Sequence, residues 1–100
     1  MTAAPTTDSA GIRRVIRALV ADGWTLDRVE YGEWEPEYVS TEAEALTILD
    51  DLDDGFLLVT KGDESGWVRF VMGNEPYEVA ADWTVNLKAV YAEVDSWDEV

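Results

Sequence analysis

The sequence predicts an α+β domain, with an antiparallel sheet of four to five strands and about three helices packed mainly on one face. Three segments space apolar residues at the 3.6-residue period of an amphipathic helix. Two apolar runs, 56–61 and 67–72, flank a glycine-containing turn and predict a hairpin. Connections of a few residues make consecutive strands antiparallel. A chain of 100 residues forms one domain, expected over 8–100, after a flexible tail of small residues over 1–7.

The first helix is expected directly after this tail. Asp8 or Ser9 would cap its start, and Gly23 would end it. Its apolar stripe consists of Ile12, Val15, Ile16, Leu19 and Val20. A strand over 24–31 and a short strand over 37–39 follow, separated by the polar segment 32–36.

The second helix is expected to open at Thr41, which forms a capping box with Glu44. The hairpin comes next, and because both of its runs are apolar throughout, we expect its strands to be covered on much of both faces. A turn over 73–76 leads to a strand over 77–82. Asp82 or Thr84 would cap a third helix with Leu87, Val90, Tyr91 and Val94 on its buried side. Full burial is expected for Leu19, Leu49 and Phe70.

Charge is the dominant feature of the composition. The chain has 22 Asp and Glu against 7 Lys and Arg, a formal net charge of -15. Residues 1–28 hold four Arg and three Asp, a net of +1, so the remaining residues carry -16. Such a surface repels nucleic acid and anionic membranes and attracts basic proteins. The alternative is that the acidity only keeps the protein soluble, as in halophilic or high-GC sources, which fits the presence of only two lysines.

Several classes of chemistry are absent from the composition. The chain has no Cys and no His, so disulfides, thiolates and imidazole ligands or bases are excluded. It has no glycine-rich phosphate loop and no Ser in a nucleophile-elbow context. We therefore expect no enzyme activity and no cofactor. No apolar run reaches about 18 residues, and residues 1–10 do not match a signal peptide, so a cytoplasmic location is expected.

The run from Asp50 to Gly55 concentrates four carboxylates at the end of the second helix. Aligned as an EF-hand loop, it places Leu52 at the third position and Lys61 at the twelfth, so we predict no EF-hand site. Weak binding of a divalent cation by these carboxylates remains an alternative. Otherwise the run is either a solvated helix end or a recognition patch, because anions at the negative end of a helix dipole are unfavourable.

The segment from Gly32 to Tyr38 alternates acidic and aromatic residues. Carboxylates bind Arg side chains, and aromatic rings bind cations through their faces. The alternative is that Trp34 and Tyr38 pack onto the core, and Trp97 raises the same question. We expect the candidate partner-binding residues to gather on one face, away from Arg13, Arg14 and Arg17. These candidates are Glu30, Glu33, Trp34, Glu35, Glu37, Tyr38, Asp50, Asp51, Asp53 and Asp54.

Residues 66–87 contain a Gly-Asn-Glu-Pro turn at 73–76 followed by Asp-Trp-Thr-Val-Asn-Leu at 82–87. This stretch, about a fifth of the chain, resembles a pattern in small uncharacterised acidic proteins of bacterial phages and other mobile elements. The resemblance brings no catalytic residues. It implies a setting in which DNA mimics and inhibitors of host defence, such as anti-CRISPR proteins, are found. From the residues alone, Asp82, Thr84 and Asn86 are expected to cap a helix and satisfy turns.

These observations together favour a non-enzymatic acidic module that binds a basic, nucleic-acid-binding surface of a partner protein, such as a host defence complex. Two alternatives remain open. One is a small accessory or structural domain whose acidity reflects its source, and the other is a carboxylate metal binder. The identity of the partner and the oligomeric state do not follow from the sequence.

Overall fold

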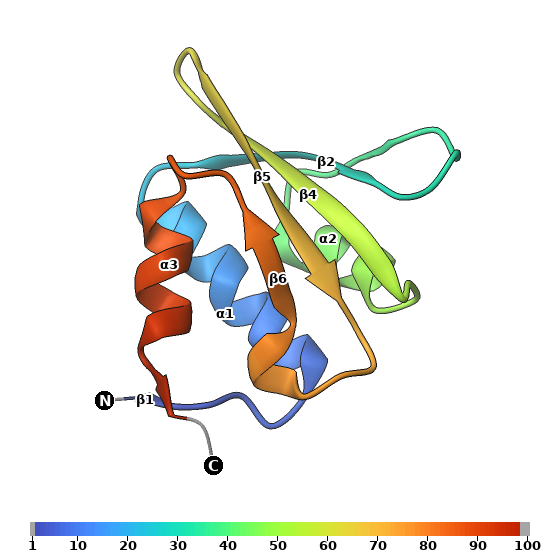
Figure 1. Cartoon of the computed structure of the whole chain (residues 1–100). Helices are drawn as coiled ribbons and strands as arrows, with labels where there is room; N and C mark the ends of the chain where they lie inside the picture. Colours follow the sequence, from blue (N-terminus) through green and yellow to red (C-terminus); the bar gives the residue numbers. More distant parts are fainter. Residues whose placement is uncertain (1, 99–100) are drawn as a thin grey trace.

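The computed structural model describes residues 2–98 and confirms the α+β class: within these residues it has three helices and a five-stranded antiparallel sheet (Figure 1). The strand order in this sheet is β3-β2-β4-β5-β6. The helices are α1 (Asp8–Ala21), α2 (Glu42–Leu49) and α3 (Lys88–Asp95). The strands of the sheet are β2 (Thr25–Glu30), β3 (Glu37–Tyr38), β4 (Asp54–Lys61), β5 (Glu64–Val71) and β6 (Ala80–Trp83). Met1, Glu99 and Val100, which belong to the expected tail and domain, lie outside the described residues.

Helix α1 is capped by Thr7, so the prediction of Asp8 or Ser9 is wrong. The Thr7 hydroxyl accepts a hydrogen bond from the Ala10 N–H at 3.0 Å. Asp8 is instead engaged at long range, because its carboxylate accepts the Gly73 N–H at 3.0 Å. The end of the helix agrees with the prediction, since Gly23 follows with a φ of +95° that favours glycine.

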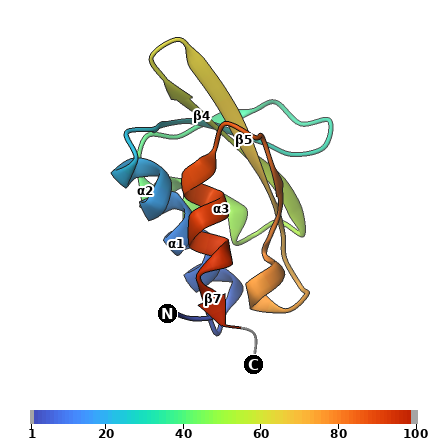
Figure 2. The same cartoon turned by 60° about the vertical axis from the view of Figure 1, so that its left-hand side comes forward.

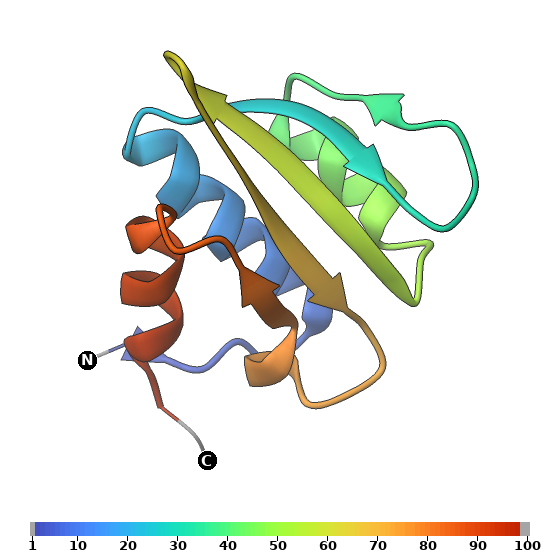
Figure 3. The same ribbon diagram turned by 45° about the horizontal axis from the view of Figure 1, so that its top comes forward.

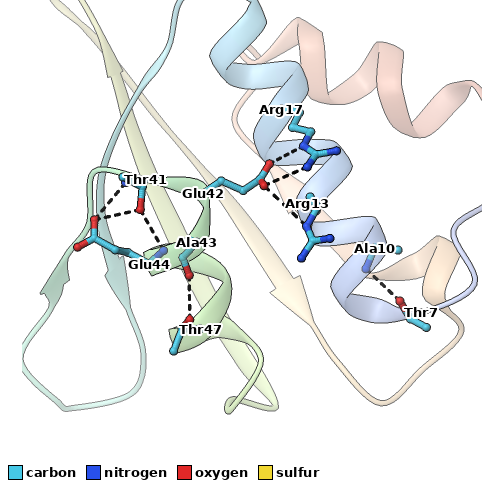
Figure 4. Close-up of polar contacts among 9 residues, drawn as sticks. All are labelled: Thr7, Ala10, Arg13, Arg17, Thr41, Glu42, Ala43, Glu44 and Thr47. Carbon is cyan, nitrogen blue, oxygen red and sulfur yellow. Dashed lines mark hydrogen bonds and ion pairs between the residues drawn. The ribbon is translucent and has the colours of Figure 1, made fainter.

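The capping box of α2 is confirmed (Figure 4). The Thr41 hydroxyl accepts the Glu44 N–H at 3.1 Å, and the Glu44 carboxylate accepts the Thr41 N–H at 3.2 Å. The Ser40 N–H also donates to this carboxylate at 3.0 Å. Hydrogen bonds from Ser40 and then Thr41 lower the pKa of Glu44 below its ordinary value.

The hairpin is also confirmed, and its strands pair from Asp54 opposite Val71 to Lys61 opposite Glu64. Burial alternates along both strands. Leu57, Val59, Val68 and Phe70 are fully buried, whereas the residues between them are half-buried or exposed. The expectation that both faces are largely covered is therefore wrong. Only one face packs into the core, because the strand period of two directs every second side chain to the other face.

The segment after β5 differs from the prediction of a strand over 77–82. Pro76–Glu78 forms a 3-10 turn, consistent with Pro76 at its first position, and β6 begins only at Ala80. Helix α3 has no side-chain cap. The Thr84 hydroxyl accepts the Trp67 N–H at 3.2 Å, and the Asn86 amide donates to the Ser65 carbonyl at 2.9 Å, so both side chains hold this segment to β5.

A single core cluster joins α1, the sheet and the two other helices. Leu19, Leu49 and Phe70 are fully buried, as predicted. Two residues assigned to buried stripes are exposed: Val20 is 53% exposed and Tyr91 is 61% exposed. α2 lies behind β4 in Figures 1 and 3, and α1 lies behind β6 in Figure 1. No helix in the described part of the chain is long and apolar enough to cross a bilayer.

The two ends of the described chain lie together. β1 (Thr2–Ala3), in the segment expected to be a flexible tail, pairs in parallel with β7 (Trp97–Asp98) (Figure 2). Trp97 is only 7% exposed and lies under the Arg14 guanidinium, 5.3 Å from the ring centre. Its Nε1–H donates to Glu93 at 2.6 Å. Trp97 is therefore part of the core and is not presented to a partner.

Candidate partner-binding site

Most cations of the protein are paired within the chain. Six of the seven Lys and Arg side chains form ion pairs with carboxylates in the described residues. Arg13 and Arg17 of α1 share Glu42 of α2, with N–O distances of 3.7 and 2.7 Å (Figure 4). Arg14 pairs with Glu93 at 3.1 Å. Arg13, Arg14 and Arg17 thus link α1 to α2 and α3.

Exposed acidic residues without an ion pair in the described structure lie in the β2–β3 loop and after α2, and also at the hairpin tip, beside the 3-10 turn, in β6 and in α3. Glu33, Glu35, Asp51 and Asp53 are exposed. None of them has an ion pair with a Lys or Arg among residues 2–98. These four carboxylates are available to an external cation.

The β2–β3 loop, which contains Trp34, and the acidic run from Asp50 to Gly55 meet at an open hollow of about 360 Å³. Glu30 pairs with Phe56, so the end of β2 lies beside the start of β4. This register brings Trp34 of the loop to Asp53 and Asp54. We call this site the acidic hollow; its lining consists of Tyr31, Gly32, Trp34, Leu52, Asp53, Asp54 and Phe56.

The loop presents its aromatic side chains to solvent. Trp34 and Tyr38 are each 76% exposed, so the interpretation that they pack onto the core is wrong. The Tyr31 hydroxyl donates to Glu37 at 2.9 Å and thereby closes the base of the loop. This hydrogen bond raises the pKa of Tyr31 above its ordinary value.

The two carboxylates of the hollow differ in their environment. Asp54 accepts two hydrogen bonds from Arg69, at 3.0 and 2.7 Å, and Asp53 has no ion pair in the described structure. The hydrogen bonds from Arg69 lower the pKa of Asp54 below its ordinary value. Asp54 therefore positions Arg69, whereas Asp53 is free to bind.

Because the pKa of Asp54 is lower in the folded protein, its pairing contributes stability above the unfolded pKa of about 4, and this contribution is lost as pH falls through the folded value. We expect Asp54→Asn to flatten the loss of stability between about pH 5 and pH 2.5. Urea unfolding across this range measures the effect. A wild-type slope in Asp54→Asn would contradict the assignment.

Other candidates lie around the hollow or turn away from it. Glu30 pairs with Arg28 at 2.7 Å, and Tyr38 lies opposite Arg28 in the β2–β3 register. Asp50 turns toward α1, where its carboxylate accepts the Ser9 hydroxyl at 2.5 Å. The expected single face therefore includes Asp53, Asp54 and Trp34 but not the Asp50 carboxylate.

Sequence reasoning missed Tyr31 and Phe56. Phe56 lies two residues after Asp54 on the same strand, so the period of two alone puts both on one face. No comparable local pattern marks Tyr31.

The described residues contain no group of three or more Asp or Glu placed to hold a metal ion. Comparison with known proteins finds no match to any protein family, curated protein or solved structure. The acidic hollow is lined by both Asp53 and the exposed Trp34, and a carboxylate together with an indole ring suits an Arg or Lys side chain.

Proposed function

We propose that this protein is a non-enzymatic acidic module that acts in the cytoplasm by occupying a basic, nucleic-acid-binding surface of a partner protein. This is the mode of small phage-type DNA mimics, including inhibitors of host defence complexes. The observation that carries the proposal is the juxtaposition of the unpaired Asp53 carboxylate with the exposed Trp34 ring, on a chain of net charge -15.

A cationic side chain of the partner would enter the acidic hollow. An Arg guanidinium donates to Asp53 and lies against the Trp34 ring, and a cation–π contact is worth about 0.5–2 kcal/mol. Glu33 and Glu35 flank Trp34 in the loop and extend the negative field. The partner's Arg and Lys would otherwise bind phosphates, so binding here excludes nucleic acid from the same surface.

Acidity as a solubility feature is the second candidate, and one observation favours it. Exposed carboxylates also occur far along the sheet from the hollow, at Asp63 and Glu64 of the hairpin tip. Solubility alone does not account for Trp34, because an indole that is 76% exposed lowers solubility.

The proposal is tested by capture and displacement. The immobilised protein is incubated with a bacterial lysate at low salt, and the retained proteins are eluted with duplex DNA. We expect DNA to release them, and we expect the double variant Trp34→Ala/Asp53→Asn to retain less than a tenth as much. A loss of this size corresponds to about 1.4 kcal/mol, within the range for one aromatic anchor and one charge-assisted bond.

The matched control is Tyr91→Ala/Asp95→Asn, which removes an exposed aromatic ring and an exposed carboxylate from α3. It should bind as the parent does. Proteins that resist elution by DNA, or equal capture by the two double variants, would contradict the proposal.

A further inference from the structure

The sheet face that points away from the core has a defined composition, given by the strand register. We call it the outer face. One cross-strand row runs through Tyr38, Arg28, Leu58 and Trp67, and the next through Glu30, Phe56, Arg69 and Asp82.

The centre of the outer face is apolar. Leu58 lies opposite Trp67, and the Phe56 ring meets the Trp67 ring edge to face with centroids 5.4 Å apart. All three side chains are only half-buried although β4 and β5 are central strands. A contiguous half-exposed apolar group in the middle of a sheet is typical of a surface that binds another chain.

The two cations of the outer face are neutralised. Arg28 pairs with Asp27 and Glu30. Arg69 pairs with Asp54, and the nearby charge of Asp82 further raises the pKa of Arg69. These four carboxylates exceed the two guanidinium groups, so the apolar centre lies in a negative surround. The charge complement is a partner with a cationic rim around an apolar stripe.

The geometry restricts the form of that partner. A second copy of this chain would also carry -15, so the two outer faces would repel each other. β4 and β5 already have hydrogen-bonded neighbours on both sides, so no strand can be added between them. Contact must be made by side chains, as when a helix packs on a sheet.

Two hollows lie along β4 at a spacing that suits a helix. The acidic hollow includes Phe56, and a second hollow of about 330 Å³ includes Leu58, Thr60 and Trp67. Phe56 and Thr60 are about 13 Å apart along the strand. Two turns of an α-helix span about 11 Å, so apolar side chains at i and i+7 reach Phe56 and the second hollow and leave Asp53 of the acidic hollow to a cation.

We propose that the outer face binds an amphipathic basic helix of the partner, with the helix's apolar stripe on Phe56, Leu58 and Trp67 and its Lys and Arg residues at the surrounding carboxylates. This inference rests on the proposed function and specifies the class of partner segment. Recognition then depends on the arrangement of apolar residues as well as on charge.

The probes are two synthetic 16-residue peptides of identical Lys, Leu and Ala content. One places Leu on a single helical face, and the other has a scrambled order. Calorimetry at low salt should give at least tenfold tighter binding for the amphipathic peptide, because only its apolar stripe meets the apolar centre in one orientation. The variant Leu58→Gln should reduce this affinity to about that of the scrambled peptide. The control Val85→Gln, at a site 94% exposed outside the sheet, should not.

Near-UV circular dichroism checks that both variants are folded. Equal affinity of the two peptides, or wild-type affinity in Leu58→Gln, would overturn the inference. If the inference fails in this way but the scrambled peptide binds the parent and binds Trp34→Ala/Asp53→Asn more weakly, the proposed function still stands. If neither peptide binds the parent, both the inference and the proposed function are wrong. If sedimentation shows that the parent is a dimer and that Leu58→Gln is a monomer, the inference is also overturned. The outer face would then bind a second copy of the chain.

Discussion

Replacing Leu49 with Ala is expected to lower the free energy of unfolding by about 2–5 kcal/mol. Leu49 is fully buried at the end of α2, and a Cβ added to Gly55 at the start of β4 would lie 3.3 Å from the Leu49 Cδ2. Removal of its side chain leaves a cavity between the helix and the sheet. A domain of this size has about 5–15 kcal/mol of total stability, so the variant loses a large share of it.

Urea denaturation followed by far-UV circular dichroism measures this loss. The matched control is Thr47→Ala on the exposed side of the same helix, where the Thr47 hydroxyl donates to the Ala43 carbonyl at 2.9 Å. It should change the stability by less than about 0.5 kcal/mol. A loss under about 1 kcal/mol for Leu49→Ala would mean that the space at this position collapses without cost.

Replacing Asp50, Asp51, Asp53 and Asp54 together with Asn is expected to weaken binding to a DNA-displaceable partner by well over tenfold. The change keeps side-chain size and removes four negative charges, so fewer cations of the partner find a counter-charge. The fold should persist. Removing the carboxylates relieves their repulsion from the negative end of the α2 dipole, and it also removes the exposed Asp54–Arg69 ion pair. These two effects on the free energy of unfolding oppose each other, and each is within about 1 kcal/mol.

A second quadruple variant distinguishes the effect of the acidic run on binding from the effect of the net charge. This variant also removes four negative charges, but from exposed sites outside the acidic hollow. Its substitutions are Asp63→Asn, Glu64→Gln, Glu75→Gln and Glu78→Gln. We expect this variant to retain most of the binding at low salt. Equal losses in the two variants would show that overall charge, and not the acidic run, attracts the partner.

Local chemistry made much of this fold predictable. Thr41 and Glu44 satisfy each other's backbone N–H groups within one turn, so the sequence alone identifies that helix start. The start of α1 was harder to predict because Thr7, Asp8 and Ser9 are all good caps. The choice depends on Gly73, which lies 65 residues after Asp8. The Gly73 N–H donates a hydrogen bond to the Asp8 carboxylate, so this carboxylate is already engaged.

The site was predictable only in part. Asp53, Asp54 and Trp34 were candidates on chemical grounds, but their proximity depends on the register of β2 against β4, which no local pattern specifies. The outer face was missed because Phe56 and Leu58 are as apolar as their buried neighbours Leu57 and Val59. Packing of the helices determines which of these alternating sets is covered.

The β2–β3 loop also bears on how such a protein can evolve. In Figure 1 the loop extends past the edge of the sheet, and every residue from Gly32 to Tyr38 is exposed. Its substitutions therefore bear little on folding, while the Tyr31–Glu37 hydrogen bond keeps its ends together. Under the proposed function, substitutions at Trp34 and its neighbours can therefore change the preference for a partner and leave the core, and with it foldability, untouched.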